Sequence, residues 1–378
     1  ALAFSPDGKR IVTSVEDNTL KIWDLASRKE MKSLSGDSTI VRCVAFSSDG
    51  KNLAAACSNN KIQVWDLENA KVDKTLEGDT SSVLSIAFSP DGKRLATGTD
   101  ANKVRIWDIG SRKVVKTIGV GSLVTSVVFS PDGKRLATGA DDNNVKIWDI
   151  SGNMKEIMLP EKTLKGHNSE IISAAFSPDG ERLATGAYDG AVKIWDWKNS
   201  RSVATLAGHI EPVNSVAFSP DGKKLATGSD DHSAKIWDLQ SGKSIMTLTG
   251  HTESVTGVAF SPDGKKLATA AYEGTAKIWE IDAETIISKL HEHGKLSALI
   301  YPQLLSWNLQ DILGMQEDNE EKLCDTKEAW QIAAFADLYA KYSTTGVEAD
   351  AGSPGYARAS RLYKCAVACG GDSTLLQR

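Results

Sequence analysis

The chain has 378 residues, of which 41% are hydrophobic and 25% are charged, and its formal net charge at pH 7 is −5. These proportions are ordinary for a globular protein, and the sequence has no basic block of the kind that favours a nucleic-acid partner. No apolar run approaches the roughly 18 residues that cross a bilayer, so we expect no membrane partner. The five cysteines are sparse and odd in number, which argues against a disulfide framework and favours a reducing, cytoplasmic location.

One phrase recurs along the chain. Its turn reads FSPDG, or FSSDG in the second copy, and starts at Phe4, Phe46, Phe88, Phe129, Phe176, Phe218 and Phe260. Each copy then reaches a tryptophan followed by an acidic residue, at Trp23, Trp65, Trp107, Trp148, Trp195, Trp237 and Trp279. Successive tryptophans are 42, 42, 41, 47, 42 and 42 residues apart, and a period in this range is typical of a repeat architecture.

The sixth copy shows the elements that each repeat predicts. VNSVAFS (213–219) is a short β-prone run that ends in the turn SPDG, where Pro and Gly occupy the second and last positions of a type I turn. KLATGS (224–229), AKIWDL (234–239) and SIMTL (244–248) predict three further strands. Four short antiparallel strands per repeat predict the blades of a propeller, in which stacked neighbours supply the core that one blade cannot form alone.

This wording and this period make the chain similar to the WD40-repeat β-propeller family over residues 1–291. The resemblance implies an all-β, seven-bladed β-propeller. In that family a His before the first strand, a Ser or Thr in the second, an Asp in the following turn and the Trp form a hydrogen-bonded structural tetrad. Two blades of this chain match it fully, blade five with His167, Thr185, Asp189 and Trp195, and blade six with His209, Thr227, Asp231 and Trp237.

The other blades depart from the tetrad. Glu273 replaces the Asp in blade seven, Val120 stands at the His position of blade four, and Ala55 replaces the Thr of blade two. We therefore expect complete networks only in blades five and six. Because a partly satisfied buried network is costly, we expect blades two and three to be the softer side of the ring. Residues 285–290 align with the outer strand 244–248, so blade seven is expected to be one continuous run that closes the ring by packing against blade one.

Residues 292–378 predict a small α-helical C-terminal extension that contains a helical hairpin. Apolar spacing indicates helices over 302–313 and 325–342, and a third between Ser353-Pro354 and Gly370-Gly371. Ala359, Tyr363 and Ala366 make this part weakly similar to the second helix of a tetratricopeptide unit. The hairpin either packs against the propeller or begins a solenoid.

Candidate chemistry along the chain favours structural explanations. His291 and His293 are two residues apart and cannot share a helix face, so a solvated linker is favoured over a metal site. Cys365 and Cys369 indicate a packed apolar stripe. The Thr, His and Asp of the tetrads recur at the same blade position, which indicates structure rather than catalysis. We expect no enzyme activity, no cofactor and no metal.

One end of the propeller is the candidate partner-binding surface. The resemblance places there the loop entering the first strand of each blade and the loop between its second and third strands. The candidate residues are Ile40, Arg42, Leu84, Leu123, Ile172, Tyr188, Asp230 and Tyr272. Apolar side chains among carboxylates predict a protein or peptide partner with basic residues beside an apolar anchor. The alternative is that these are ordinary rim residues.

Two functions remain open at this point. The leading one is a non-catalytic protein–protein interaction module, because near-uniform repeats with a helical tail are similar to the WD40 sensor regions of large bacterial signalling proteins. Such a region would regulate an ATPase-like or caspase-like effector, and as a fragment it is expected to be a monomer. The alternative is a freestanding scaffold that assembles a multiprotein complex.

Overall fold

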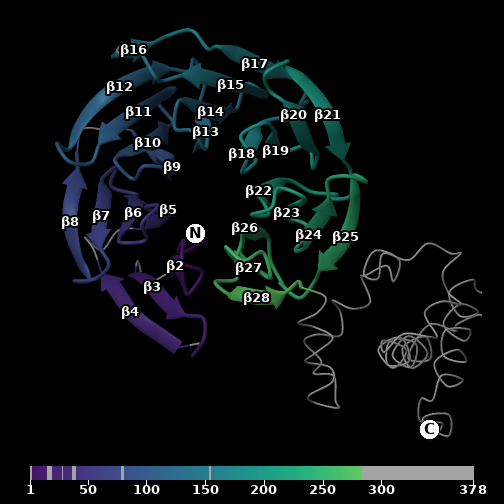
Figure 1. The fold of residues 1–378 in the computed structure, drawn as a ribbon, viewed down its shortest axis with the longest axis horizontal. Helices are drawn as coiled ribbons and strands as arrows, with labels where there is room; N and C mark the ends of the chain where they lie inside the picture. The colour runs from purple at the N-terminus through teal and green to yellow at the C-terminus, as the bar shows by residue number, and fades with distance from the viewer. Residues whose placement is uncertain are drawn as a thin grey trace, which may run out of the picture. The chain divides into compact units, whose positions relative to one another are not determined.

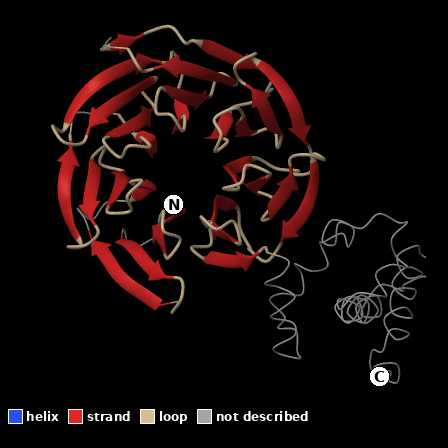
Figure 2. Cartoon of the chain, viewed as in Figure 1, coloured by secondary structure: helices blue, strands red, loops and turns tan. Residues whose placement is uncertain are grey.

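The computed structural model describes residues 2–14, 19–27, 29–35, 40–77, 81–152 and 155–282. These residues form seven small sheets arranged around a central axis, within one compact unit that spans Ala1–Asp282 (Figure 1). They contain strands, turns and loops and no helix (Figure 2), which confirms the predicted all-β, seven-bladed propeller. The predicted C-terminal helices, the strand at 285–290 and the linker at 291–293 lie outside the described residues.

The strands of each blade follow one another from the central axis outward (Figure 1). The first four blades contain β1 (Leu2–Phe4), β2 (Arg10–Ser14), β3 (Thr19–Asp24) and β4 (Lys29–Ser35); β5 (Val41–Phe46), β6 (Asn52–Cys57), β7 (Ile62–Asp66) and β8 (Lys71–Leu76); β9 (Val83–Phe88), β10 (Arg94–Thr99), β11 (Lys103–Asp108) and β12 (Lys113–Gly119); and β13 (Val124–Phe129), β14 (Arg135–Ala140), β15 (Asn144–Asp149) and β17 (Lys162–Lys165). The last three contain β18 (Ile171–Phe176), β19 (Leu183–Ala187), β20 (Val192–Asp196) and β21 (Arg201–Leu206); β22 (Val213–Phe218), β23 (Lys224–Ser229), β24 (Ala234–Asp238) and β25 (Lys243–Leu248); and β26 (Val255–Phe260), β27 (Lys266–Ala271) and β28 (Ala276–Glu280).

The long spacing of 47 residues after Trp148 has a structural counterpart. The extra residues form β16 (Glu156–Ile157), which pairs in parallel with the outer strand β12 of blade three. Blade three is therefore a five-stranded sheet, whereas β17 completes blade four by pairing with β15. The sequence spacing marked this insertion, but nothing in it indicated which blade the added strand would join.

The hydrophobic core lies between blades. One cluster combines Leu20 and Ile22 of blade one with Leu53 and Trp65 of blade two, all 3% exposed or less. The next clusters likewise join blades two and three, three and four, four and five, and five and six. Burial of these side chains stabilises the fold by about 1.5–3 kcal/mol each. Because each cluster needs residues from two blades, a blade taken alone would expose half of it.

Close packing between blades depends on a small residue in the second strand. A Cβ placed on Gly139 of β14 would lie only 2.6 Å from Cγ2 of Ile171, at the start of the first strand of the next blade. Any side chain there would push blades four and five apart. Blade seven likewise contacts blade one directly, since a Cβ on Gly8 would lie 2.9 Å from Cδ of Pro262.

The repeated SPDG turn is held by its own side chains. In blade six the amide of Gly222 donates to the carbonyl of Ser219 at 2.8 Å, and Gly222 has a φ of 69°, which favours glycine. The Ser219 hydroxyl donates to Asp221 at 2.6 Å and accepts from the amide of Lys224 at 2.8 Å. Ser, Asp and Gly of the phrase therefore each have a local role in the turn, which explains why they recur.

Neighbouring inner strands are also joined by hydrogen bonds in the described part of the ring. A serine hydroxyl of one blade accepts the backbone amide of the next, as in Ser85 with Val127 (3.1 Å), Ser126 with Ala174 (3.1 Å), Ser173 with Val216 (3.2 Å) and Ser215 with Val258 (3.1 Å). Blade seven has Gly257 at this position and so offers no hydroxyl to blade one. Blade two has Cys43 at the equivalent position, so the seam between blades two and three also lacks the serine hydroxyl, and the softness of blades two and three stays a prediction.

Replacing Gly257 with serine is expected to strengthen the seam between blades seven and one. A Cβ there would lie 3.5 Å from Cβ of Leu2, which is an ordinary contact. The backbone amide in the equivalent position, which would donate to the new hydroxyl, is that of Leu2. Gly257→Ser should raise the free energy of unfolding in urea by about 0.5–1.5 kcal/mol more than Gly257→Ala, which adds the Cβ without the hydroxyl. Equal stability of the two variants would contradict the proposed hydrogen bond.

Candidate functional site

Two sets of loops meet at the end of the ring opposite the SPDG turns. In six blades the amide of a residue between the second and third strands donates to a carbonyl just before the first strand. The pairs are Ser58 with Ile40 (2.8 Å), Asp100 with Ser82 (3.1 Å), Asp141 with Leu123 (3.2 Å), Tyr188 with Glu170 (2.9 Å), Asp230 with Pro212 (3.0 Å) and Tyr272 with Ser254 (2.9 Å). We call the surface formed by these pairs the top face. The structure thus brings together Ile40, Leu123, Tyr188, Asp230 and Tyr272 in equivalent places.

The remaining candidate residues lie in β-bulges. Val41 pairs with Cys57 and Cys43 with Ala56, which leaves Arg42 as an extra residue in the first strand of blade two. Leu84 and Ile172 occupy the same position in blades three and five. A bulge redirects the extra side chain and is common beside functional sites. Arg42 is exposed, whereas Leu84 and Ile172 are half-buried.

Exposed apolar side chains are concentrated in a subset of the predicted positions. Tyr188 and Tyr272 are 61% and 78% exposed, and Ile40 is 64% exposed, while Leu123 is half-buried. Sequence reasoning missed Ile210, which is 86% exposed and directly follows the tetrad residue His209. The equivalent residues after the other tetrad histidines are Asn168 and Thr252, so comparing this position among repeats could have identified Ile210.

The top face is rich in carboxylates. Asn214 donates from Nδ2 to Oδ1 of Asp230 at 2.6 Å and to the carbonyl of Val255 at 3.2 Å, so it fixes this carboxylate between blades six and seven. Burial, and then the neighbouring carboxylate of Asp141, raise the pKa of Glu170. A nearby cation would relieve this repulsion, so the electrostatics of this area favour a basic ligand group.

The blade-six tetrad joins the two top loops through side chains. Trp237 donates from Nε1 to the Thr227 hydroxyl at 2.9 Å, and that hydroxyl lies 2.7 Å from Nε2 of His209. The hydroxyl proton then points to Nε2, which leaves the His209 Nδ1–H to donate to Asp231 at 2.6 Å. Burial opposes the charge of Asp231, but hydrogen bonds from His209 and Ser233 outweigh it and lower the pKa of Asp231 to about 2.

The expectation that networks are complete only in blades five and six is wrong in two respects. In blade seven the longer side chain of Glu273 reaches Nδ1 of His251 at 2.5 Å, and His251 also contacts Thr269 at 2.7 Å, so glutamate closes the network. Burial opposes the charge of Glu273, yet hydrogen bonds from Thr275 and His251 lower its pKa to about 2.

Of the two blades expected to be complete, blade five has a network that stays open. Trp195 and His167 both contact Thr185, at 2.8 and 2.7 Å, but Nδ1 of His167 lies 3.6 Å from Asp189. The Asp189 carboxylate instead accepts the amides of Asn168 and Ala191. Among the described residues, the buried Nδ1 has no hydrogen-bond partner, and burial lowers the pKa of His167 to about 4.

Blade four uses a lysine where the histidine is missing. The Lys146 ammonium donates to Asp142 at 2.5 Å and to the carbonyl of Val120 at 2.8 Å, and Trp148 still donates to Thr138 at 3.0 Å. Lys146 thus joins the same two loops that a histidine joins in blade six. Comparing the repeats showed that Val120 replaces the tetrad histidine in blade four. It could not show that a side chain from the third strand replaces the missing contact.

Blade two also has an unpaired group at its tetrad position. Ala55 stands where the other blades have threonine, and in the part of the chain that the structure describes, the buried Nε1–H of Trp65 has no hydrogen-bond acceptor. Leaving such a donor unpaired costs about 1–3 kcal/mol.

The described residues contain no cluster of three or more His, Cys, Asp or Glu side chains that could hold a metal ion. They also contain no helix long and apolar enough to cross a membrane.

Comparison with protein-family models matches most of the ring. Residues 1–161 match the model described as IFT122 first beta-propeller. Residues 158–196, 200–238 and 242–280 each match the model described as WD domain, G-beta repeat. No curated protein matches the chain. The matched residues are the seven sheets around the axis, so the family models and the strand topology agree.

Restoring the missing acceptor in blade two is expected to stabilise the protein. Thr97 accepts from Trp107 at 3.1 Å in the next blade, and both Thr97 and Ala55 are fully buried. The free energy of unfolding of Ala55→Thr should exceed that of Ala55→Val by about 1 kcal/mol, because valine has the same shape as threonine but no acceptor. If the valine variant is equally stable, the unpaired Trp65 is not the cause of the defect.

Lowering the pH is expected to destabilise the ring through His167. Its pKa is near 6.5 in the unfolded chain and about 4 in the folded one, so between these values the unfolded chain binds more protons. Stability should therefore fall as the pH drops from 6.5 to 4, by at most about 1.4 kcal/mol per pH unit for this group. Urea unfolding of His167→Gln across this range should give a shallower slope than the wild type, with His232→Gln as the control for losing an exposed imidazole.

Proposed function

We propose that this chain, in which the family models match β-propeller repeats within residues 1–280, is a non-catalytic protein–protein interaction module that binds its partner on the top face. WD40 propellers are a scaffold fold for protein interactions. One observation carries the choice of face: Tyr188, Ile210 and Tyr272 are large, apolar and more than half exposed. Such groups beside charged side chains are typical of a protein-binding surface.

The rigidity of the loops supports this proposal. The loops that carry Tyr188 and Tyr272 each make a backbone hydrogen bond to the neighbouring loop, at 2.9 Å in both blades. The closed networks of blades six and seven add side-chain bonds through His209 and His251. A site that is already ordered loses less conformational entropy when a partner binds. Tyrosine adds a large contact area with few rotatable bonds.

The partner that fits best is a protein or peptide with basic residues beside an apolar anchor. Asp100, Asp141, Glu170 and Asp230 lie in the paired loops of the top face, whereas Arg42 is the cation among the candidate residues. Opposite charge accelerates association and disfavours wrong partners. The apolar anchor of the partner would contact Tyr188, Ile210 or Tyr272.

The cellular setting is proposed from the repeats themselves. The near-uniform sequences of the repeats favour a ligand-sensing or regulatory region of a larger bacterial signalling protein. This region would act in the cytoplasm on an ATPase-like or caspase-like effector. The alternative, a scaffold that assembles several proteins, requires a second surface away from the top face. The insertion of blade four exposes Met158 and Leu159 away from the top face and would supply such a surface.

The top face can be tested by affinity capture from a lysate of the source organism. Tyr188→Ala/Tyr272→Ala should reduce recovery of the specific partner by about tenfold or more, since truncation of a central interface aromatic typically costs about 2 kcal/mol or more. Val203→Ala is the matched control, because Val203 is also exposed and lies on the outer strand of blade five. Thermal unfolding of each variant verifies the fold.

Charge provides an independent arm of the same experiment. Asp230→Asn should weaken partner capture and reduce its dependence on salt, because a screened attraction is removed. Identical partner profiles for the wild type, the double tyrosine variant and Asp230→Asn would reject the top face as the binding surface.

A further inference from the structure

The insertion between β15 and β17 is a distinct feature of the outer rim. Trp148 and Trp195 are 47 residues apart, whereas the other successive tryptophans are 41 or 42 apart. The other repeats form their blades without these residues, so blade formation does not require them. Figure 1 shows β16 on the outside of the ring beside β12, away from the inner strands.

The first part of the insertion is fixed to blade three. The amide of Thr117 donates to the carbonyl of Lys155 at 2.7 Å, and β16 pairs with Thr117 and Ile118 of β12. The Ile157 side chain packs against the cluster that contains the buried Ile118. These contacts set the position and direction of the chain just before Met158.

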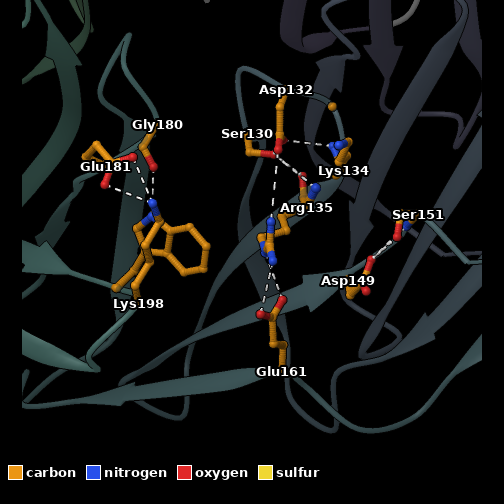
Figure 3. Close-up of polar contacts among 12 residues, drawn as sticks. Ser130, Asp132, Lys134, Arg135, Asp149, Ser151, Glu161, Gly180, Glu181 and Lys198 are labelled. Carbon is orange, nitrogen blue, oxygen red and sulfur yellow. Dashed lines mark hydrogen bonds and ion pairs between the residues drawn. The ribbon is translucent and has the colours of Figure 1, made fainter.

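The last part of the insertion is fixed to blade four. The amide of Glu161 donates to the carbonyl of Ile147 at 2.7 Å. Its carboxylate accepts two hydrogen bonds from Arg135, at 2.8 and 3.2 Å (Figure 3), and the Arg135 guanidinium lies 5.1 Å from the ring centroid of Trp197. A bidentate ion pair that also stacks on an aromatic ring is among the better-defined contacts on a protein surface.

Between these two anchors, the chain exposes two large apolar side chains. Met158 is 67% exposed and Leu159 is 84% exposed. The thioether of Met158 rests over Gly119, where a Cβ would lie 2.9 Å from its terminal methyl group. A loop that is anchored on both sides therefore holds an apolar pair in water, although the pair contributes little to the core of either blade.

The charges around this pair are opposite in sign to those of the top face. Lys155 precedes it and Lys162 follows it in the same segment, and Lys165 ends the next strand. Arg135 already compensates the charge of Glu161, and within the described residues Glu156 is the acidic group of the insertion that forms no ion pair. Lys155 and Lys162 therefore favour an acidic ligand at this part of the rim.

We propose that Met158 and Leu159 anchor a second binding site, on the outer rim, for an acidic peptide segment that carries an apolar residue. The apolar residue of the ligand covers Met158 and Leu159, and its carboxylates lie near Lys155 and Lys162. This site does not depend on the top face, since it lies on the insertion of blade four and selects the opposite charge.

The test uses short fluorescent peptides and the full chain. One panel places a single Leu, Phe or Trp among Asp and Glu, a second replaces the apolar residue with Ala, and a third replaces the acids with Lys. Fluorescence anisotropy should detect binding of the first panel in preference to the other two. Met158→Ser/Leu159→Ser should weaken that binding by about tenfold or more, and Lys155→Glu/Lys162→Glu should weaken it and reduce its salt dependence.

Two controls separate this site from the top face and from a loss of fold. Tyr188→Ala/Tyr272→Ala should bind the acidic apolar peptides as the wild type does. Leu159→Ser alone, at a position that is mostly in water, should weaken binding without lowering the unfolding temperature.

Three results would overturn the proposal. The first is that no acidic apolar peptide binds the wild type, and the second is that Met158→Ser/Leu159→Ser binds these peptides equally well. The third is sedimentation with vesicles of phosphatidylcholine and phosphatidylserine that depends on Met158 and Leu159 while the peptides do not bind, which would assign the pair to a lipid surface.

Discussion

The fold rests on apolar packing between neighbouring blades. Trp65 of blade two is buried with Leu20 and Ile22 of blade one, and Trp195 of blade five is buried with Ile147 of blade four. Each sheet therefore needs a neighbour on both sides, and a ring meets that need for every sheet at once. The same need explains why the repeats are so alike, because a blade must fit the preceding blade on one face and the following blade on the other.

The ring provides a stiff frame whose loops can vary. On the top face a backbone hydrogen bond joins the two loops of a blade, and in blades six and seven a histidine and a carboxylate join them again. Because these bonds use the backbone, the side chain at a given position can differ between blades, as Tyr188, Asp230 and Tyr272 show. Binding chemistry can therefore change at the loop tips without disturbing the inter-blade cores.

Equivalent polar networks can be built from different residues. His209 with Asp231, His251 with Glu273, and Lys146 with Asp142 all connect the loop before the first strand to the loop after the second. Matching residues by type identified the first of these, but it scored Glu273 and Val120 as losses. It also scored blade five as complete, although Asp189 turns away to two backbone amides and leaves Nδ1 of His167 unpaired. The distance between the histidine Nδ1 and the carboxylate is 3.6 Å in blade five but 2.6 Å in blade six, a difference that residue type does not specify.

The sequence by itself determined the number of blades, the strands, the SPDG turns and the position of the insertion, because these depend on local turn chemistry and on a repeated apolar pattern. The resemblance to the WD40-repeat family further implied which loops share a face. Only the tertiary structure decided that Ile210 is exposed while Leu84 and Ile172 are half-buried, and that β16 joins blade three. Those outcomes depend on contacts between residues far apart in the chain, whose distances no local pattern encodes.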